Sequence, residues 1–452
     1  MKLINILTVF FTTFSILSCF KPIIGLPTDN QLLSPLLALL IVLYNYFYKK
    51  EIFINKFSSI VIYIFLIASI LSILSIPLCI NDNVRIIRHC ITYLLGSLII
   101  LTSANLISIR SVIKGCDIAL IITYIGFILQ RFLPSIFNMF VFLGNRGGYD
   151  SLNSRGLTSF YSEGGYLVTS MFAIILIYYL AQKKLVFYNV FFPVIAMLIT
   201  GAGQVLKTSG EFFLYSVLSI FIFNISKLIK NKKIIIKRVM NYKKVLIICF
   251  SIFVFLLILI FIPLITESVL TKLPNQVLGI GTRFLKLLFS IFESEFNIVR
   301  IIAITDDNLL FKIAGYILTP LVIFLIPFNL CPMKMWSMNY FNQFPEFAEI
   351  YKEVQINIFG AYQFPGMPFL SLGSLIIDFG LIGLIGFLLI LFLCFRTIQM
   401  DFSFCDTKIL EKSMIFGAII TALVDNHGIG TWVTWFTLGF FFANNSLKLR
   451  RL

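Results

Sequence analysis

Charged residues are scarce in this chain, and acidic residues are the scarcer kind. Charged residues make up 12% of the 452 positions, with 20 acids against 36 bases, whereas 59% of the residues are hydrophobic. Soluble globular domains carry about 25% charged residues, so this composition excludes a soluble protein. Apolar runs of about 20 residues recur along the whole chain, as transmembrane helices require. The net charge of +16 therefore indicates lysine accumulation on the cytoplasmic side of a membrane, and nucleic acid is not predicted as a partner.

Patterns that hold metals, nucleotides or disulfides are also missing from the sequence. The two histidines are isolated from each other, and the eight cysteines lie mostly inside apolar runs without paired spacing. This distribution argues against a zinc site and a disulfide framework. The chain contains neither a Walker loop nor a dinucleotide glycine motif, so no cofactor and no metal is predicted.

Twelve apolar segments are predicted to form transmembrane helices. They are residues 3–20, 31–48, 58–80, 88–108, 112–133, 163–182, 186–204, 208–226, 245–265, 372–395, 408–425 and 428–446. The loop from Lys227 to Lys244 holds eight basic residues and no acid, which predicts that it is cytoplasmic. Both termini are then cytoplasmic, and the first segment is a membrane helix and not a cleaved signal. The predicted fold class is an all-α polytopic integral membrane protein of about 12 helices.

This topology divides the chain into three parts. Residues 1–265 hold helices one to nine with an outer loop at 134–162, residues 266–371 form a large outer loop, and residues 372–452 hold helices ten to twelve. The large loop is predicted to be partly helical, with amphipathic or re-entrant segments. Its apolar stretch 312–330 contains Pro320 and Pro327, and counting it as a span would place the basic C-terminal tail outside.

Arginine and lysine are distributed differently across the predicted membrane. Seven of the 12 arginines, but only seven of the 24 lysines, fall on the outer side. The outer arginines are Arg85, Arg88, Arg131, Arg146, Arg155, Arg283 and Arg300. Because the planar guanidinium group makes bidentate contacts with phosphate, this bias indicates a phosphorylated ligand on the outer face. Ordinary ion pairing in the loops is the alternative.

The stretch Asn153–Tyr166 carries the most informative charges. Arg155 and Glu163 stand eight residues apart at the outer mouth of the sixth predicted helix, and charges kept close to lipid are usually functional or paired. Arg155 is a candidate for binding an anion, and Glu163 is a candidate base or orienting group. The alternative is a surface arginine and a helix cap, since Glu163 also suits the positive end of a helix. Arg283 in the large loop is the second phosphate candidate.

Four local patterns follow one another along the chain. In Arg155–Glu163 an arginine, a glycine, aromatic residues and an acid precede the sixth predicted helix, and Lys207–Gly210 is a predicted turn that opens a later one. Gly281–Arg283 places an arginine early in the large loop, and in Ser371–Gly386 an acid, Asp378, precedes Gly-Leu-Ile-Gly. In this order the four patterns resemble those of the O-antigen polymerase (Wzy) family, in the O-antigen polymerase and ligase superfamily of membrane glycosyltransferases. The arginine–ten–glycine spacing of some members is not reproduced at Arg146, Arg155 or Arg283.

The resemblance implies polymerisation of lipid-linked oligosaccharide repeats, such as those of lipopolysaccharide, on the outer face of the bacterial cytoplasmic (inner) membrane. Donor and acceptor would both be undecaprenyl-diphosphate-linked oligosaccharides, and membrane lipid and a chain-length regulator protein would be partners. Arg155 and Arg283 would bind the diphosphate, and Arg146 and Arg300 are further candidates for this role. Glu163 would act as a base or as a group that orients the reactants.

Two other functions stay open on the sequence. A ligase of the same superfamily would carry a histidine in the large loop, and residues 266–371 contain none, which favours a polymerase. A flippase or another transporter would place charges deep in several spans, whereas the charges here gather at the outer ends of the spans. No internal repeat is evident, which also weakens the transporter alternative.

Overall fold

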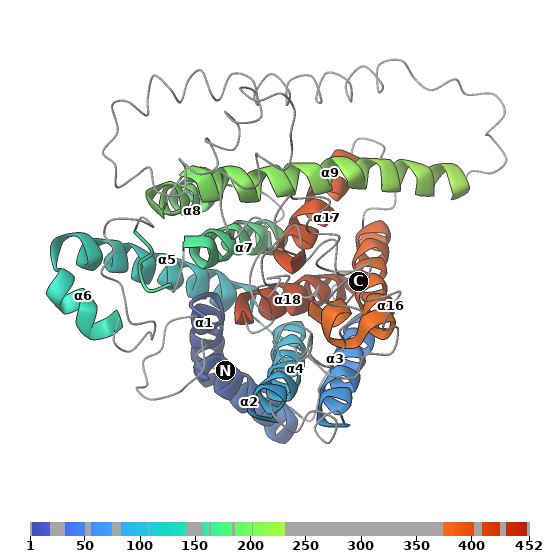
Figure 1. Ribbon diagram of the computed structural model, residues 1–452, viewed down its shortest axis with the longest axis horizontal. Helices are drawn as coiled ribbons and strands as arrows, with labels where there is room; N and C mark the ends of the chain where they lie inside the picture. The colour runs from blue at the N-terminus through green and yellow to red at the C-terminus, as the bar shows by residue number, and fades with distance from the viewer. Residues whose placement is uncertain are drawn as a thin grey trace, which may run out of the picture.

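A computed structural model describes about half of the chain in detail. The described residues are 2–18, 32–49, 56–74, 83–106, 108–141, 157–161, 164–182, 186–200, 202–230, 374–401, 409–424 and 431–449. Every regular element in these ranges is helical, which confirms the all-α class for this part of the chain (Figure 1). The ninth predicted span, 245–265, and the large loop, 266–371, lie outside the described residues.

The helices follow the apolar segments closely. The α-helices are α1 (Lys2–Ile16), α2 (Leu33–Tyr44), α3 (Lys56–Leu74), α4 (Asn83–Ala104), α5 (Ile109–Phe132), α6 (Pro134–Val141), α7 (Gly164–Gln182), α8 (Phe187–Thr200), α9 (Ala202–Lys230), α16 (Ser374–Asp401), α17 (Ile409–Val424) and α18 (Trp432–Leu449). A short π-helix, η1 (Asn45–Lys49), continues α2. A helix therefore lies over each predicted span that falls within the described residues.

Four of the helical segments are long and apolar enough to cross a membrane. They are Lys56–Leu74, Ile109–Phe132, Gly164–Gln182 and Leu381–Gln399. Five shorter apolar helices accompany them, at Leu3–Ile16, Leu33–Tyr48, Cys90–Ala104, Phe187–Thr200 and Trp432–Ala443. By helix length and hydropathy the chain is a multi-pass membrane protein.

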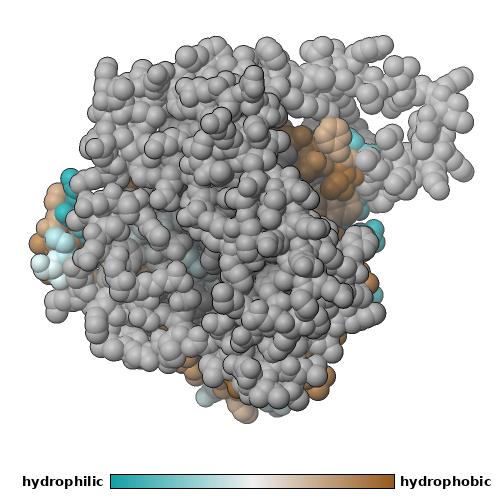
Figure 2. Space-filling model, viewed as in Figure 1, coloured by the Kyte–Doolittle hydropathy of each residue, from teal (hydrophilic) through white to brown (hydrophobic). Residues whose placement is uncertain are grey.

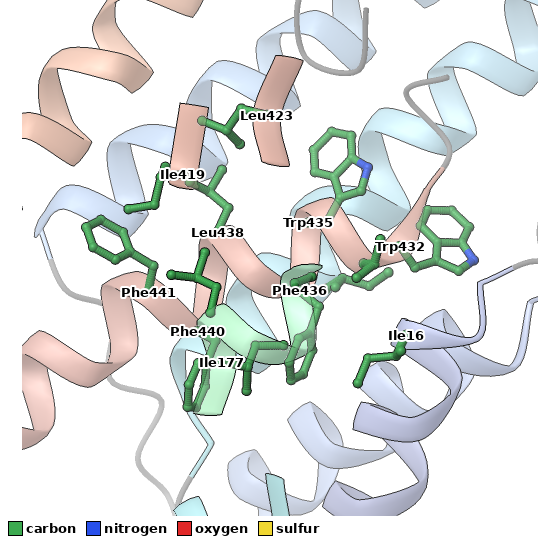
Figure 3. Packing of buried hydrophobic residues seen from close by; sticks show 14 of the residues in the cluster. Ile16, Ile177, Ile419, Leu423, Trp432, Trp435, Phe436, Leu438, Phe440 and Phe441 are labelled. Carbon is green, nitrogen blue, oxygen red and sulfur yellow. The ribbon is translucent and has the colours of Figure 1, made fainter. Parts of the chain in front are cut away.

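The helix α18 forms the centre of the bundle. Every residue from Thr431 to Ala443 is buried, as expected for a helix that is hydrophobic all round. Figure 3 shows Ile16 of α1, Ile177 of α7 and Ile419 of α17 around the side chains of α18. In the ribbon view, α7 and α18 lie between α8 and α9 on one side and α2 and α4 on the other (Figure 1).

The peripheral helices expose large apolar side chains instead of polar ones. On α3, Val61 and Phe65 face the core while Tyr63, Ile67 and Ile70 are exposed. Brown, hydrophobic residues are visible at several edges of the molecule in Figure 2. A soluble helix would place polar residues on this face, so the outward apolar face is typical of contact with lipid.

Small and hydroxyl-bearing residues occupy the tightest helix contacts, as is common in membranes. A Cβ atom added at Gly439 of α18 would lie 1.9 Å from the Ser103 Oγ of α4. Buried hydroxyls such as those of Thr8 and Thr12 donate to the carbonyl four residues earlier, at 2.8 and 2.9 Å. These bonds satisfy the hydroxyl groups without a partner from another helix.

One local prediction needs correction. The turn predicted at Lys207–Gly210 is absent from that position, because α9 runs without interruption from Ala202 to Lys230. Glycine is better tolerated in membrane helices than in soluble ones, so Gly210 does not end the helix. The segment 134–162, which is predicted to be an outer loop, begins with a helix, α6, whose first residue is Pro134, a residue favoured at this helix position.

Candidate functional site

The charged residues predicted to carry the chemistry lie outside the described residues. They are Arg146, Arg155, Glu163, Arg283 and Arg300. Nothing in the described part of the chain tests their roles, which stay predictions. The segment between Arg155 and Glu163 is nevertheless described from Leu157 to Tyr161, and it shows how this part of the chain is held.

The Leu157–Tyr161 turn is docked against the C-terminal half of α5. The Gln130 Oε1 atom accepts hydrogen bonds from the backbone N–H groups of Thr158, at 3.0 Å, and Ser159, at 2.9 Å. The Tyr161 N–H donates to the Thr158 carbonyl at 3.1 Å, which closes the turn. Thr158, Ser159 and Tyr161 are each 1% exposed. Three of the five residues of this irregular segment are therefore buried, and the backbone amides of these three have partners, as burial requires.

Ser159 adopts a backbone conformation that its residue type seldom takes. Its φ angle is 54°, in the left-handed region that disfavours residues with a Cβ atom. The Ser159 Oγ atom donates to the Thr123 carbonyl of α5 at 2.8 Å, which fixes the residue in this conformation. Such conformations persist where the surrounding structure over-determines them.

A glycine on α5 makes room for the turn. A Cβ atom added at Gly126 would lie 2.0 Å from the Ser159 Oγ atom and 2.9 Å from the Phe160 ring. Thr123, Gly126 and Gln130 follow at intervals of three and four residues, which places them on one face of the helix. This face of α5 is therefore shaped to accept the turn.

The helix α6 holds the other side of the turn. The rings of Phe137 and Phe160 stack with centroids 5.7 Å apart, and Phe137 is 2% exposed. In the sequence, α6 precedes Arg146 and the turn follows Arg155. The Phe137–Phe160 contact therefore anchors the chain before and after these two arginines.

A buried carboxyl group occupies the first turns of α16. The Tyr93 hydroxyl of α4 donates to the Asp378 Oδ2 atom at 2.6 Å, and both residues are 0% exposed. Trp435, Phe65 and Phe379 surround the pair: the Tyr93 ring centroid lies 6.3 Å from that of Phe65 and 5.8 Å from that of Phe379. Asp378, the acid that precedes Gly-Leu-Ile-Gly in the sequence, is thus hydrogen-bonded to α4 within an aromatic cluster.

Two further carboxyl groups meet the C-terminal part of α7. The Tyr178 hydroxyl donates to Asp117 Oδ1 of α5 at 2.5 Å, and the neighbouring Tyr179 hydroxyl donates to Glu411 Oε1 of α17. These contacts bring the C-terminal end of α7 next to the N-terminal ends of α5 and α17. The three helices are therefore tied together at one end of the bundle.

Sequence reasoning did not identify Gln130 or Tyr93. Each lies in a mainly apolar helix beside another polar residue, Arg131 next to Gln130 and Thr92 next to Tyr93, so neither stands out in the sequence. Arg131 is the exposed basic residue in the last turn of α5, whereas the side chain of Gln130 is buried. The side chains of Lys207 and Glu211 are not among those that the structure describes.

Comparison with known proteins adds no relative. No protein-family model, no curated protein and no solved structure matches the chain.

Proposed function

We propose that the chain is a membrane glycosyltransferase that polymerises undecaprenyl-diphosphate-linked oligosaccharide repeats on the outer face of the bacterial cytoplasmic membrane. The observation that carries the proposal is the docked Leu157–Tyr161 turn. It lies between Arg155 and Glu163, in the stretch whose residues resemble the polymerase family, and it is held by α5 and α6. Residues held in conformations such as that of Ser159 cluster at active sites and ligand-binding segments, which supports a functional role for this turn.

The proposed topology has twelve membrane helices with both termini in the cytoplasm. The contacts of α7 support it. Asp117 and Glu411 are both predicted to be cytoplasmic, and so is the end of α7 that carries Tyr178 and Tyr179, whose hydroxyls bind these two acids. At the other end of the bundle, the Ser15 and Ser34 hydroxyls lie 2.6 Å apart, which agrees with a short outer connection between α1 and α2.

The proposed reaction transfers the growing glycan to the incoming repeat. A hydroxyl oxygen of the acceptor sugar bonds to the anomeric carbon of the donor glycan, and the bond from that carbon to the diphosphate oxygen breaks. The hydroxyl proton passes to a base, for which Glu163 is the candidate. Undecaprenyl diphosphate leaves with the electron pair, and Arg155 and Arg283 stabilise its negative charge. Arg146 and Arg300 are further candidates for the same anion.

A ligase of the same superfamily and a flippase or transporter are the alternatives. A cell without the polymerase still transfers a single repeat to its final acceptor, whereas a cell without the ligase transfers none. A transporter would be expected to expose Asp378 to a central pathway. The full burial of Asp378 and its bond to Tyr93 support a structural link between helices more than a role in transport.

Arg155→Ala is expected to abolish polymer while the protein remains in the membrane at the wild-type level. The substitution removes a positive charge where the leaving diphosphate develops negative charge, and loss of one such group lowers the rate about 100- to 1,000-fold. The measurement is the length distribution of surface glycan on a gel, in a deletion strain complemented with each variant, beside the amount of protein in the membrane.

Two matched variants make the result specific. Arg155→Lys keeps the charge but loses the planar, bidentate group, so shorter or fewer chains are expected. Arg110→Ala removes an exposed arginine at the opposite end of α5 and is expected to leave the glycan unchanged. Polymer of wild-type length from Arg155→Ala at normal protein level would contradict the proposed function.

A further inference from the structure

We propose that Gln130 is a positioning residue for glycosyl transfer: it acts by fixing the Leu157–Tyr161 turn and does not touch the substrate. This inference rests on the proposed function, because it assigns a role to the turn in that reaction. Gln130 is 6% exposed, and its Oε1 atom accepts hydrogen bonds from two backbone N–H groups of the turn.

The bonds of Gln130 hold the turn and not the helix that carries the residue. Both donors belong to residues 28 and 29 positions further along the chain, while the backbone of α5 continues to Phe132. An apolar side chain at position 130 would still suit a membrane helix. The principal effect of removing the amide oxygen is therefore to leave two buried N–H groups of the turn without this acceptor.

Several independent contacts define one conformation of the turn. The Ser159 hydroxyl holds the residue at positive φ, Gly126 leaves space for it, and Phe137 stacks on Phe160. Catalytic groups need to be held within about 0.5 Å of the productive geometry by supporting residues. The turn begins two residues after Arg155 and ends two residues before Glu163, so fixing the turn restricts where the chain that carries these two residues can lie.

The test compares Gln130→Met with Gln130→Glu. Methionine has a similar length but does not replace the oxygen acceptor, so the turnover at saturating lipid-linked repeat is expected to fall about tenfold or more. Glutamate keeps an oxygen acceptor at the same position in either protonation state and is expected to retain most of the turnover. Turnover, KM and glycan length are measured on full-length protein, normalised to the amount in the membrane.

Gln182→Met is the matched control. It is the same substitution in a partly buried glutamine, and it also breaks a side-chain hydrogen bond, from the Asn189 amide to Gln182 Oε1 at 3.0 Å. Gln182 ends α7, at the opposite end of that helix from the turn. Its turnover is expected to stay within about twofold of wild type.

Ser159→Ala provides a second, milder variant. It removes the bond to the Thr123 carbonyl without adding volume, and turnover is expected to fall severalfold with normal protein level. Should Gln130→Met fail to accumulate in the membrane, Ser159→Ala decides the question, and normal turnover by that variant overturns the inference.

The outcomes separate this inference from the proposed function. Normal turnover by Gln130→Met, with no polymer from Arg155→Ala, overturns the positioning role and leaves the function standing. Wild-type polymer from Arg155→Ala overturns the function itself. Loss of turnover by Gln130→Met and by Gln130→Glu alike also overturns the positioning role, because the retained acceptor then makes no difference.

Discussion

Gly417→Val is expected to remove most of the folded protein from the membrane. A Cβ atom at Gly417 of α17 would lie 2.3 Å from the Ser216 Oγ atom of α9, and 2.7 and 2.8 Å from the Ser216 N and Cα atoms. The last two contacts are with backbone, so a change of side-chain rotamer does not relieve them. The valine would force α9 and α17 apart along their contact.

The expected loss of stability is about 3 kcal/mol or more, at the upper end of the range for overpacked cores. A loss of this size is a large fraction of the stability of a typical protein. The measurement is the amount of protein in the membrane, together with the apparent Tm of detergent-solubilised protein by fluorescence-detected size-exclusion chromatography.

Gly210→Val is the matched control for this prediction. Gly210 also lies in α9, but a Cβ atom there meets nothing within 4 Å. Valine has a higher helix propensity than glycine, so this variant is expected to accumulate at or above the wild-type level. Equal levels and equal Tm for the two valine variants would contradict the packing seen between α9 and α17.

The positions of the helices could be predicted from the sequence because bilayer thickness fixes the length of an apolar span. The predicted spans 112–133 and 163–182 correspond to α5, Ile109–Phe132, and α7, Gly164–Gln182. Hydropathy reports only how apolar a segment is, so it does not distinguish a connecting turn from a polar stretch within a helix. For this reason a turn was predicted at Lys207–Gly210, although α9 continues through these residues.

The contacts that shape the candidate site could not be predicted in the same way. The Tyr93–Asp378 bond joins residues 285 positions apart, and no periodic pattern in a single sequence connects such residues. Ser159 at positive φ had no sequence signal either, since serine is not typical of that conformation. Pro134 was a usable signal for the start of α6, because proline is favoured at the first position of a helix.

The bond between Tyr93 and Asp378 is expected to contribute about 0.5–1.5 kcal/mol of coupling energy, the range for the net effect of an intramolecular hydrogen bond. Tyr93→Phe keeps the ring within its aromatic cluster and removes only the hydroxyl donor. Asp378→Leu removes the acceptor and leaves an apolar side chain with the same number and branching of heavy atoms. If the bond links α4 to α16, each single variant lowers the stability, and the double variant loses less than the sum of the two.

The double-mutant cycle is measured by reversible unfolding of the purified protein in detergent, with Tyr63→Phe as the control. Tyr63 lies on the outward face of α3 and is 62% exposed, so loss of its hydroxyl is expected to change stability by less than about 0.5 kcal/mol. Additive effects of Tyr93→Phe and Asp378→Leu would show that the two side chains do not stabilise each other. Strong coupling would mean that the Tyr93–Asp378 bond helps to hold α16 against α4, because α16 presents Asp378 to α4 within its first turns.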